Sequence, residues 1–90
     1  MTALPGGVAE YRRTPVFTET TVPAALTGEH ATKPGVWAVI AVETGRLEFH
    51  DIETGATRVL EAGATAVVSP ERRHKVTPLG PTSFYVAFHR

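Results

Sequence analysis

Apolar residues recur at two-residue intervals along most of the chain, and turn residues divide it into short segments. The clearest alternation lies in residues 46–52, where Leu47 and Phe49 face one way and the residues between them face the other. No stretch of ten residues keeps a 3.6-residue period free of proline and glycine, so helix is expected only over about one turn, within residues 21–27. The pattern predicts strands at residues 16–20, 36–43, 46–52, 57–60, 64–68, 74–77 and 82–89.

Seven or eight short strands joined by tight turns are typical of an antiparallel sandwich or barrel. We therefore expect one domain over residues 14–90, with residues 1–13 as an N-terminal arm. Segment 36–43 is apolar on both faces, so both should be covered. The arm and a second subunit remain alternative covers for the face that carries Trp37.

Charge and composition argue against several classes of function. Nine basic and nine acidic residues give zero net charge, which argues against nucleic acid or an anionic membrane as a partner. The chain has no cysteine, which excludes disulfides and thiolate metal sites and fits a reducing compartment. Its longest apolar run is too short to cross a bilayer, and its first residues do not resemble a signal peptide. We therefore expect a cytoplasmic protein.

Histidines carry the candidate chemistry, because no phosphate-binding loop, dinucleotide fingerprint or nucleophile elbow occurs in the sequence. His30 precedes the apolar segment 36–43, and His74 follows Pro70 by four residues. Both positions lie where a chain enters or leaves a barrel mouth. Two neutral imidazoles converging there would suit zinc, iron, nickel or copper. The alternative is that both are hydrogen-bonded structural residues. His50 and His89 are less favoured as ligands.

The combination of three segments resembles a known family. Residues 45–49 (Gly-Arg-Leu-Glu-Phe), residues 60–63 (Leu-Glu-Ala-Gly) and residues 68–76 look like a small cupin. More narrowly, residues 30–37 (His-Ala-Thr-Lys-Pro-Gly-Val-Trp), followed by Pro70-x-x-x-His74, are similar to the TehB/YeaR-like domain, a tellurite-resistance-associated cupin. The likeness extends from about Tyr11 to Val86.

The resemblance implies an all-β, cupin-like double-stranded β-helix (jelly roll) whose mouth holds a small pocket, often with a divalent metal. Related domains occur alone or ahead of a methyltransferase domain, but this sequence has no glycine-rich methyltransferase loop, so methyl transfer is not expected. Cupins also carry a His-x-His pair, whereas Thr32 stands in place of the second histidine here. A third metal ligand would have to be Glu29, Glu48, His50 or water.

Cationic and aromatic residues near the two histidines suggest a second type of ligand. Lys33, Arg72 and Arg73 flank His30 and His74 and could pair with an oxyanion. Thr32 and Trp37 could line the same pocket. The alternative is that the cations are solvated loop residues and that Trp37 fills the sandwich or a dimer interface.

Three hypotheses follow. The first is a stand-alone module that binds a metal or a small anionic ligand through His30 and His74, with Thr32, Lys33, Trp37 and Arg72 around them, and that acts in tellurite or oxidative-stress resistance. The second is a metal-dependent oxygenase, isomerase or hydrolase acting on a small molecule, which needs a third protein ligand. The third is a homodimeric interaction module with a vestigial pocket.

Overall fold

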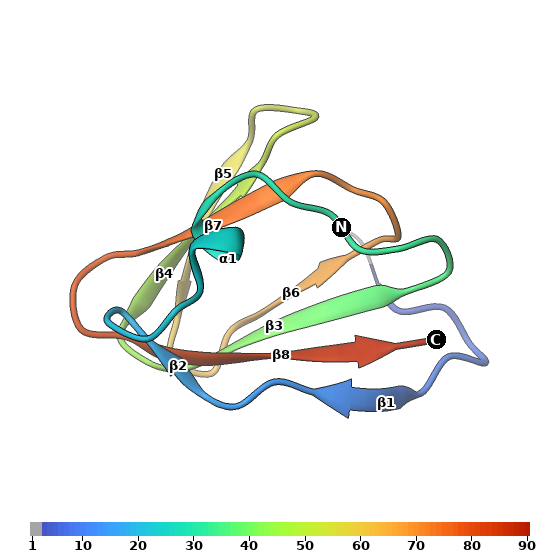
Figure 1. The fold of residues 1–90 in the computed structure, drawn as a ribbon, viewed down its shortest axis with the longest axis horizontal. Helices are drawn as coiled ribbons and strands as arrows, with labels where there is room; N and C mark the ends of the chain where they lie inside the picture. The colour runs from blue at the N-terminus through green and yellow to red at the C-terminus, as the bar shows by residue number, and fades with distance from the viewer. Residues whose placement is uncertain (1–2) are drawn as a thin grey trace.

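The strands of this computed structural model form two antiparallel sheets, and the structure describes residues 3–90. One sheet has the order β1-β8-β3-β6, with β2 also paired to β8 (Figure 1). The expectation of an all-β fold is confirmed. The strands of this sheet are β1 (Glu10–Arg13), β2 (Phe17–Thr18), β3 (Trp37–Thr44), β6 (Thr65–Val68) and β8 (Ser83–His89).

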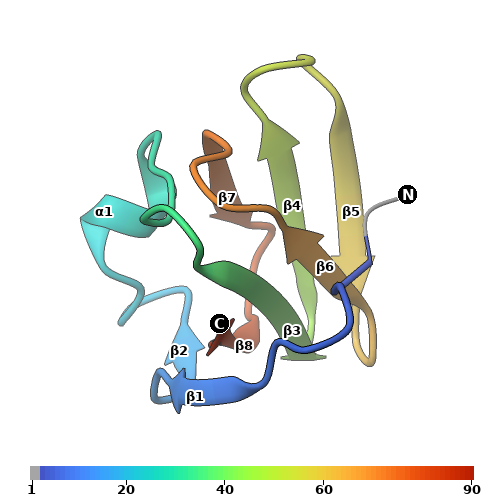
Figure 2. The same cartoon turned by 90° about the vertical axis from the view of Figure 1, so that its right-hand side faces the viewer.

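The second sheet has three strands in the order β5-β4-β7 and faces the first (Figure 2). Its members are β4 (Arg46–Asp51), β5 (Thr57–Glu61) and β7 (His74–Pro78). The helix α1 (Ala24–Thr27) is a single turn that follows Pro23, as expected from the sequence. It contacts β7, a strand of the second sheet.

Alternating residues of both sheets meet in one core. On β3, Ala38, Ile40 and Val42 are buried, while the residues between them are half-buried. Phe84 of β8 and Leu47 of β4 are fully enclosed. The complete cluster consists of Ala38, Ile40, Val42, Leu47, Leu60, Ala66, Val68, Val76, Phe84 and Val86.

The β3–β4 turn depends on Gly45, which has a φ of 74°. Its backbone lies directly against Pro81 and Thr82, the residues that lead into β8. The buried Thr82 hydroxyl donates to the carbonyl of Arg46 at 2.8 Å, and the Thr82 N–H donates to the carboxylate of Glu19 at 3.1 Å. This turn therefore fixes how the two sheets meet at one end of the sandwich.

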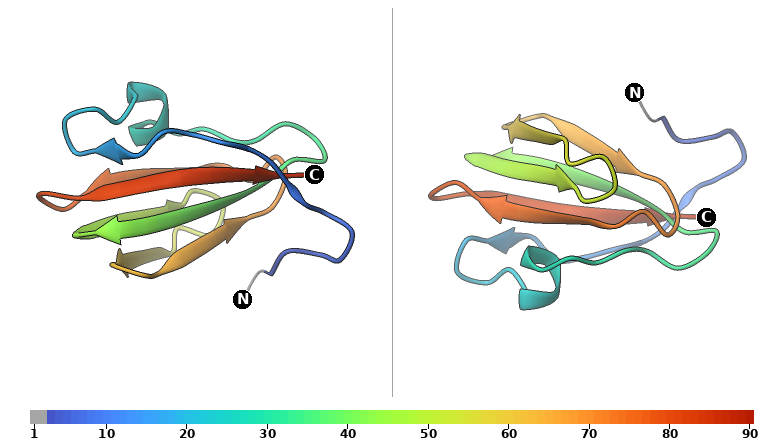
Figure 3. Two further views of the ribbon diagram at one scale, coloured as in Figure 1. Left: turned by 90° about the horizontal axis from the view of Figure 1, so that it is seen from below. Right: turned by 90° about the horizontal axis from the view of Figure 1, so that it is seen from above.

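The segment expected to be an arm contains β1, which pairs with β8. Before β1, the chain runs from the β6 side of the sheet to its β1 edge (Figure 3). Ala3 and Leu4 line one cavity together with Val39, which lies on the face of β3 that also carries Trp37. The N-terminal segment thus borders part of that face. Within residues 3–90, no helix has the length and apolar character needed to cross a membrane.

Candidate ligand-binding site

Two backbone hydrogen bonds bring His30 and His74 together from distant parts of the chain. The N–H of each donates to the carbonyl of the other at 2.9 Å, in an isolated antiparallel bridge. The segment after α1 is thereby held against the start of β7. The two imidazole centroids lie 4.1 Å apart, with the rings tilted by 60°. The pair singled out from the sequence is therefore one physical cluster.

Both rings are oriented by the same kind of contact. The Nδ1 of His30 lies 2.9 Å from the carbonyl oxygen of Gly28, and the Nδ1 of His74 lies 2.7 Å from that of Arg72. A carbonyl oxygen only accepts, so each Nδ1 carries the proton. In the neutral ring, Nε2 then has a free lone pair, and in the charged ring it becomes a second donor. Each Nε2 is the atom left for a ligand.

His74 is the more deeply buried member, with 2% of its surface exposed. Its ring also stacks on Phe49 at a centroid distance of 5.7 Å. Burial lowers the pKa of His74 below its usual value, against the opposing effect of the Arg72 carbonyl, and the neighbouring His30 lowers it further. An empty site therefore keeps this imidazole neutral at neutral pH.

Acid is expected to destabilise the protein through His74. The unfolded chain takes up a proton near pH 6.5, whereas the folded state resists it to lower pH, so stability falls as the pH drops below about 6.5. One such proton changes the free energy of unfolding by at most about 1.4 kcal/mol per pH unit. Urea unfolding at pH 7.5, 6.5 and 5.5 measures this. The slope should shrink in His74→Gln, and an unchanged slope in that variant would contradict the assignment.

A cavity of about 300 Å³ lies beside the histidine pair. Its inner wall is apolar and includes buried core residues of β3, β7 and β8. Its polar side is formed by β1, by the chain after α1 and by the histidines. The lining residues are Tyr11, Arg12, Leu26, His30, Ala31, Thr32, Lys33, Ala38, Ile40, His74, Val76, Phe84, Val86 and Phe88.

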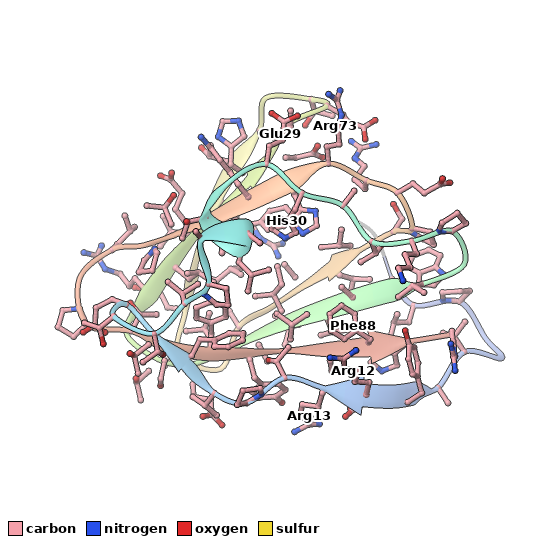
Figure 4. All side chains as sticks on the ribbon, in the orientation of Figure 1. Arg12, Arg13, Glu29, His30, Arg73 and Phe88 are labelled. Carbon is pink, nitrogen blue, oxygen red and sulfur yellow. The ribbon has the colours of Figure 1, made fainter. Side chains whose placement is uncertain are left out.

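The polar side of the cavity is basic. Arg12 and Lys33 are exposed cations at its edge, and Arg12 leaves β1 in the opposite direction to Arg13 (Figure 4). Thr32 donates its hydroxyl proton to the carbonyl of Val36 at 2.7 Å, which leaves its oxygen able to accept. Among the lining residues that the structure describes, none is a carboxylate. The cavity therefore has a positive edge with no built-in counter-ion.

The sequence-proposed third metal ligands do not join the histidine pair. Glu29 pairs with Arg73 at 3.2 Å at the top of the molecule (Figure 4). Glu48 and His50 alternate with the inward-facing Leu47 on β4 and do not line the cavity. Over residues 3–90, no group of three or more His, Cys, Asp or Glu side chains could hold a metal ion. The described residues of this site therefore offer a metal ion only the two imidazoles as ligands.

Trp37 and Arg72, both proposed as pocket residues, are not among those that line this cavity. Trp37 neighbours the buried Ala38 on β3 and occupies the opposite, half-buried face. Arg72 forms an ion pair with Asp51 at 2.7 Å and borders a second cavity on the β6 side. Arg72 still reaches the site through its carbonyl, which orients His74.

Several lining residues were missed from the sequence. Tyr11 and Arg12 belong to β1, whose four residues are all exposed and show no alternation that would signal a cavity. Leu26 and Phe88 are half-buried and were not singled out from the sequence, which placed them only within segments 21–27 and 82–89. Arg12 can be recognised as a lining residue only from the structure, because the pairing of Arg12 with Phe88 places β1 at the cavity edge.

Comparison with known proteins identifies the family. A profile of the TehB-like domain matches residues 12–86. The chain belongs to the TehB-like domain family. The TehB/YeaR resemblance inferred from the motifs is therefore confirmed. The match begins at Arg12 and ends at Val86, so it includes both histidines and nearly the whole cavity lining.

Individual relatives of this TehB-like chain agree with the family assignment. The uncharacterized protein YeaR of Escherichia coli strain K12 is 27% identical over 94 residues, which covers 94% of this chain and 79% of YeaR. A crystal structure of a structural-genomics target protein from the same strain superimposes with a TM-score of 0.89 at 28% identity and covers 100% of this chain and 97% of that one. The crystal structure of TehB from Haemophilus influenzae gives a TM-score of 0.85 at 26% identity over 93% of this chain. The present chain spans about a third (32%) of that TehB chain.

Proposed function

We propose that this TehB-like chain binds a small anionic ligand at the histidine end of the cavity. The observation that carries the proposal is the composition of the lining: Arg12, Lys33, His30 and His74 face one space that, among the described residues, contains no carboxylate. Basic side chains left without counter-ions around a concave site favour an anion.

The two kinds of cation play different roles in this proposal. Arg12 and Lys33 are permanently charged and attract the anion to the cavity edge. His74 is neutral when the cavity is empty and becomes a second donor through Nε2 when an anion arrives. Because its Nδ1 already donates to a carbonyl, the gained proton binds Nε2.

The resemblance to cupins supports two finer proposals. We propose that the two-sheet sandwich is a cupin-like double-stranded β-helix, with the cavity as its mouth. We also propose that oxyanions such as tellurite are among the ligands and that the protein acts in tellurite or oxidative-stress resistance. The family match and the basic cavity edge are consistent with both.

A divalent metal held by His30 and His74 is the second candidate. The observation that favours it is the pair of Nδ1-to-carbonyl contacts, since metal-binding histidines usually donate their other N–H to an oxygen in this way. Water or an exogenous ligand would have to complete the coordination, because the described residues supply no third ligand. A metal would supply Lewis acidity at this position.

Neighbouring arginines provide a matched test of anion binding. Acetate, phosphate, selenite and tellurite would be titrated into the protein at pH 6.0, with NMR shifts of the His30 and His74 rings as the readout. Arg12→Gln should weaken binding by about three- to tenfold, which corresponds to one partly exposed charge-assisted contact. Arg13→Gln, from the adjacent position on the other face of β1, should leave it unchanged.

Equal effects of the two variants, or ring shifts for none of the four anions, would refute the anion proposal. Zinc added to the wild-type protein tests the second candidate in the same experiment. Zinc binding that disappears in His30→Ala, with no response to any of the anions, would favour the metal.

A further inference from the structure

The cavity has apolar lining residues as well as basic ones. A bare oxyanion needs donors on several sides, but much of the lining of this space consists of apolar side chains without donors. The inner wall consists of Leu26, Ala38, Ile40, Val76, Phe84, Val86 and Phe88. None of these side chains can hydrogen-bond to an anion or to a water molecule.

Apart from the half-buried Leu26 and Phe88, the residues of the inner wall are buried. Ile40 and Val76 are each 2% exposed, and Phe84 is 0% exposed. A water placed among them would lack the two to four polar partners that buried waters normally have. This part of the cavity therefore suits a hydrocarbon group better than water or an inorganic ion.

We propose that the ligand is a small organic acid, with its carboxylate at Arg12, Lys33 and the histidine pair and its apolar body against the inner wall. This inference rests on the proposed anion-binding function and specifies its ligand class. An amphipathic acid matches both the polar and the apolar residues of the lining, whereas an inorganic oxyanion matches only the polar ones.

The volume of the cavity limits the size of the acid. About 300 Å³, at roughly 30 Å³ of liquid volume per water-sized unit, holds roughly ten non-hydrogen atoms. An unbranched acid of six to eight carbons, or a single-ring aromatic acid, fits this range. A long-chain fatty acid exceeds it.

The position of α1 allows the apolar part of the cavity to be tested by substitution. Leu26 lies in the middle of this single helical turn and is half-buried against the core. It lines the cavity, whereas its neighbour Ala25 is exposed and does not. Enlarging Leu26 should shorten the available space without touching the basic edge.

The test is a chain-length series in which acetate, butyrate, hexanoate, octanoate and decanoate are compared with phosphate and selenite by calorimetry at pH 6.0. Affinity should rise by about fourfold per methylene up to six to eight carbons, because each buried CH₂ contributes a similar transfer free energy. It should then level off or fall at decanoate. Phosphate and selenite should bind more weakly than hexanoate.

Leu26→Phe should move the optimum to a shorter acid, with Ala25→Phe as the exposed control. Thermal unfolding of both variants shows that each remains folded. Should Leu26→Phe unfold, Leu26→Ala replaces it and should move the optimum to a longer acid.

Four results would overturn the inference. Affinity independent of chain length, or phosphate and selenite binding as tightly as hexanoate, would refute the organic acid while leaving anion binding intact. An optimum that does not move in the Leu26 variant would refute the placement of the apolar body. Binding of neither acids nor oxyanions would refute the inference and the proposed function together.

Discussion

Phe84→Ala is expected to lower the free energy of unfolding by about 3–5 kcal/mol, the range seen for aromatic truncations in well-packed cores. The Phe84 ring is 0% exposed. It packs edge-to-face against Phe17 at a centroid distance of 5.8 Å and lies between the cavity and the core. Removing it joins a new void to the existing cavity, and the surrounding strands cannot close that void. Urea unfolding at pH 7.5 measures the loss.

Phe88→Ala is the matched control on the same strand. Phe88 is half-buried at the cavity edge, so its truncation should lower stability by only about 1–2 kcal/mol. Small domains have about 5–15 kcal/mol in total, so the two variants should be clearly separated. Equal losses would contradict the central position given to Phe84.

Gly45→Ala is expected to lower stability by about 2–5 kcal/mol, combining left-handed backbone strain with steric overlap. At a φ of 74° an L-residue is already strained. In addition, a Cβ at this position would overlap the carbonyl oxygen of Pro81 and lie 2.8 Å from the Cα of Thr82. These are backbone atoms that cannot move aside without shifting the start of β8. A drop in melting temperature of roughly 10 °C or more is expected.

Gly55→Ala separates the two contributions. Gly55 has nearly the same φ, 76°, but no atom would lie within 4 Å of an added Cβ. This variant should therefore lose only the strain, about 1–2 kcal/mol. If Gly45→Ala were no more damaging than Gly55→Ala, the close approach of the β3–β4 turn to Pro81 would be wrong.

Local sequence patterns predicted the strands because each pattern has a local cause. Alternation in residues 46–51 places Leu47 in the core, and glycines with positive φ end the hairpins. Strand β1 was missed because all four of its residues are exposed, so no apolar face marks it. Its position depends on pairing with β8, more than 70 residues away in sequence.

The candidate site was predictable only in part. His30 and His74 stood out as residues at strand ends, and the structure places them in contact. Arg72 looked equivalent to Lys33 from the sequence, but the carboxylate of Asp51 holds its side chain on the β6 side. Trp37 and Ala38 are adjacent in sequence, and the two-residue period of β3 puts them on opposite faces. Which residues line the cavity therefore depends partly on contacts with residues that are distant in the sequence.

Proton uptake on ligand binding tests the central claim most directly. Hexanoate or acetate would be titrated into the protein calorimetrically at pH 7.0 in two buffers of different ionisation enthalpy, and the affinity measured again at pH 6.0. The neutral His74 should gain a proton as the anion binds, so binding should take up protons and tighten at the lower pH. His74→Gln should reduce both effects. Proton release, or affinity that weakens at pH 6.0, would contradict an anion site built on these two histidines.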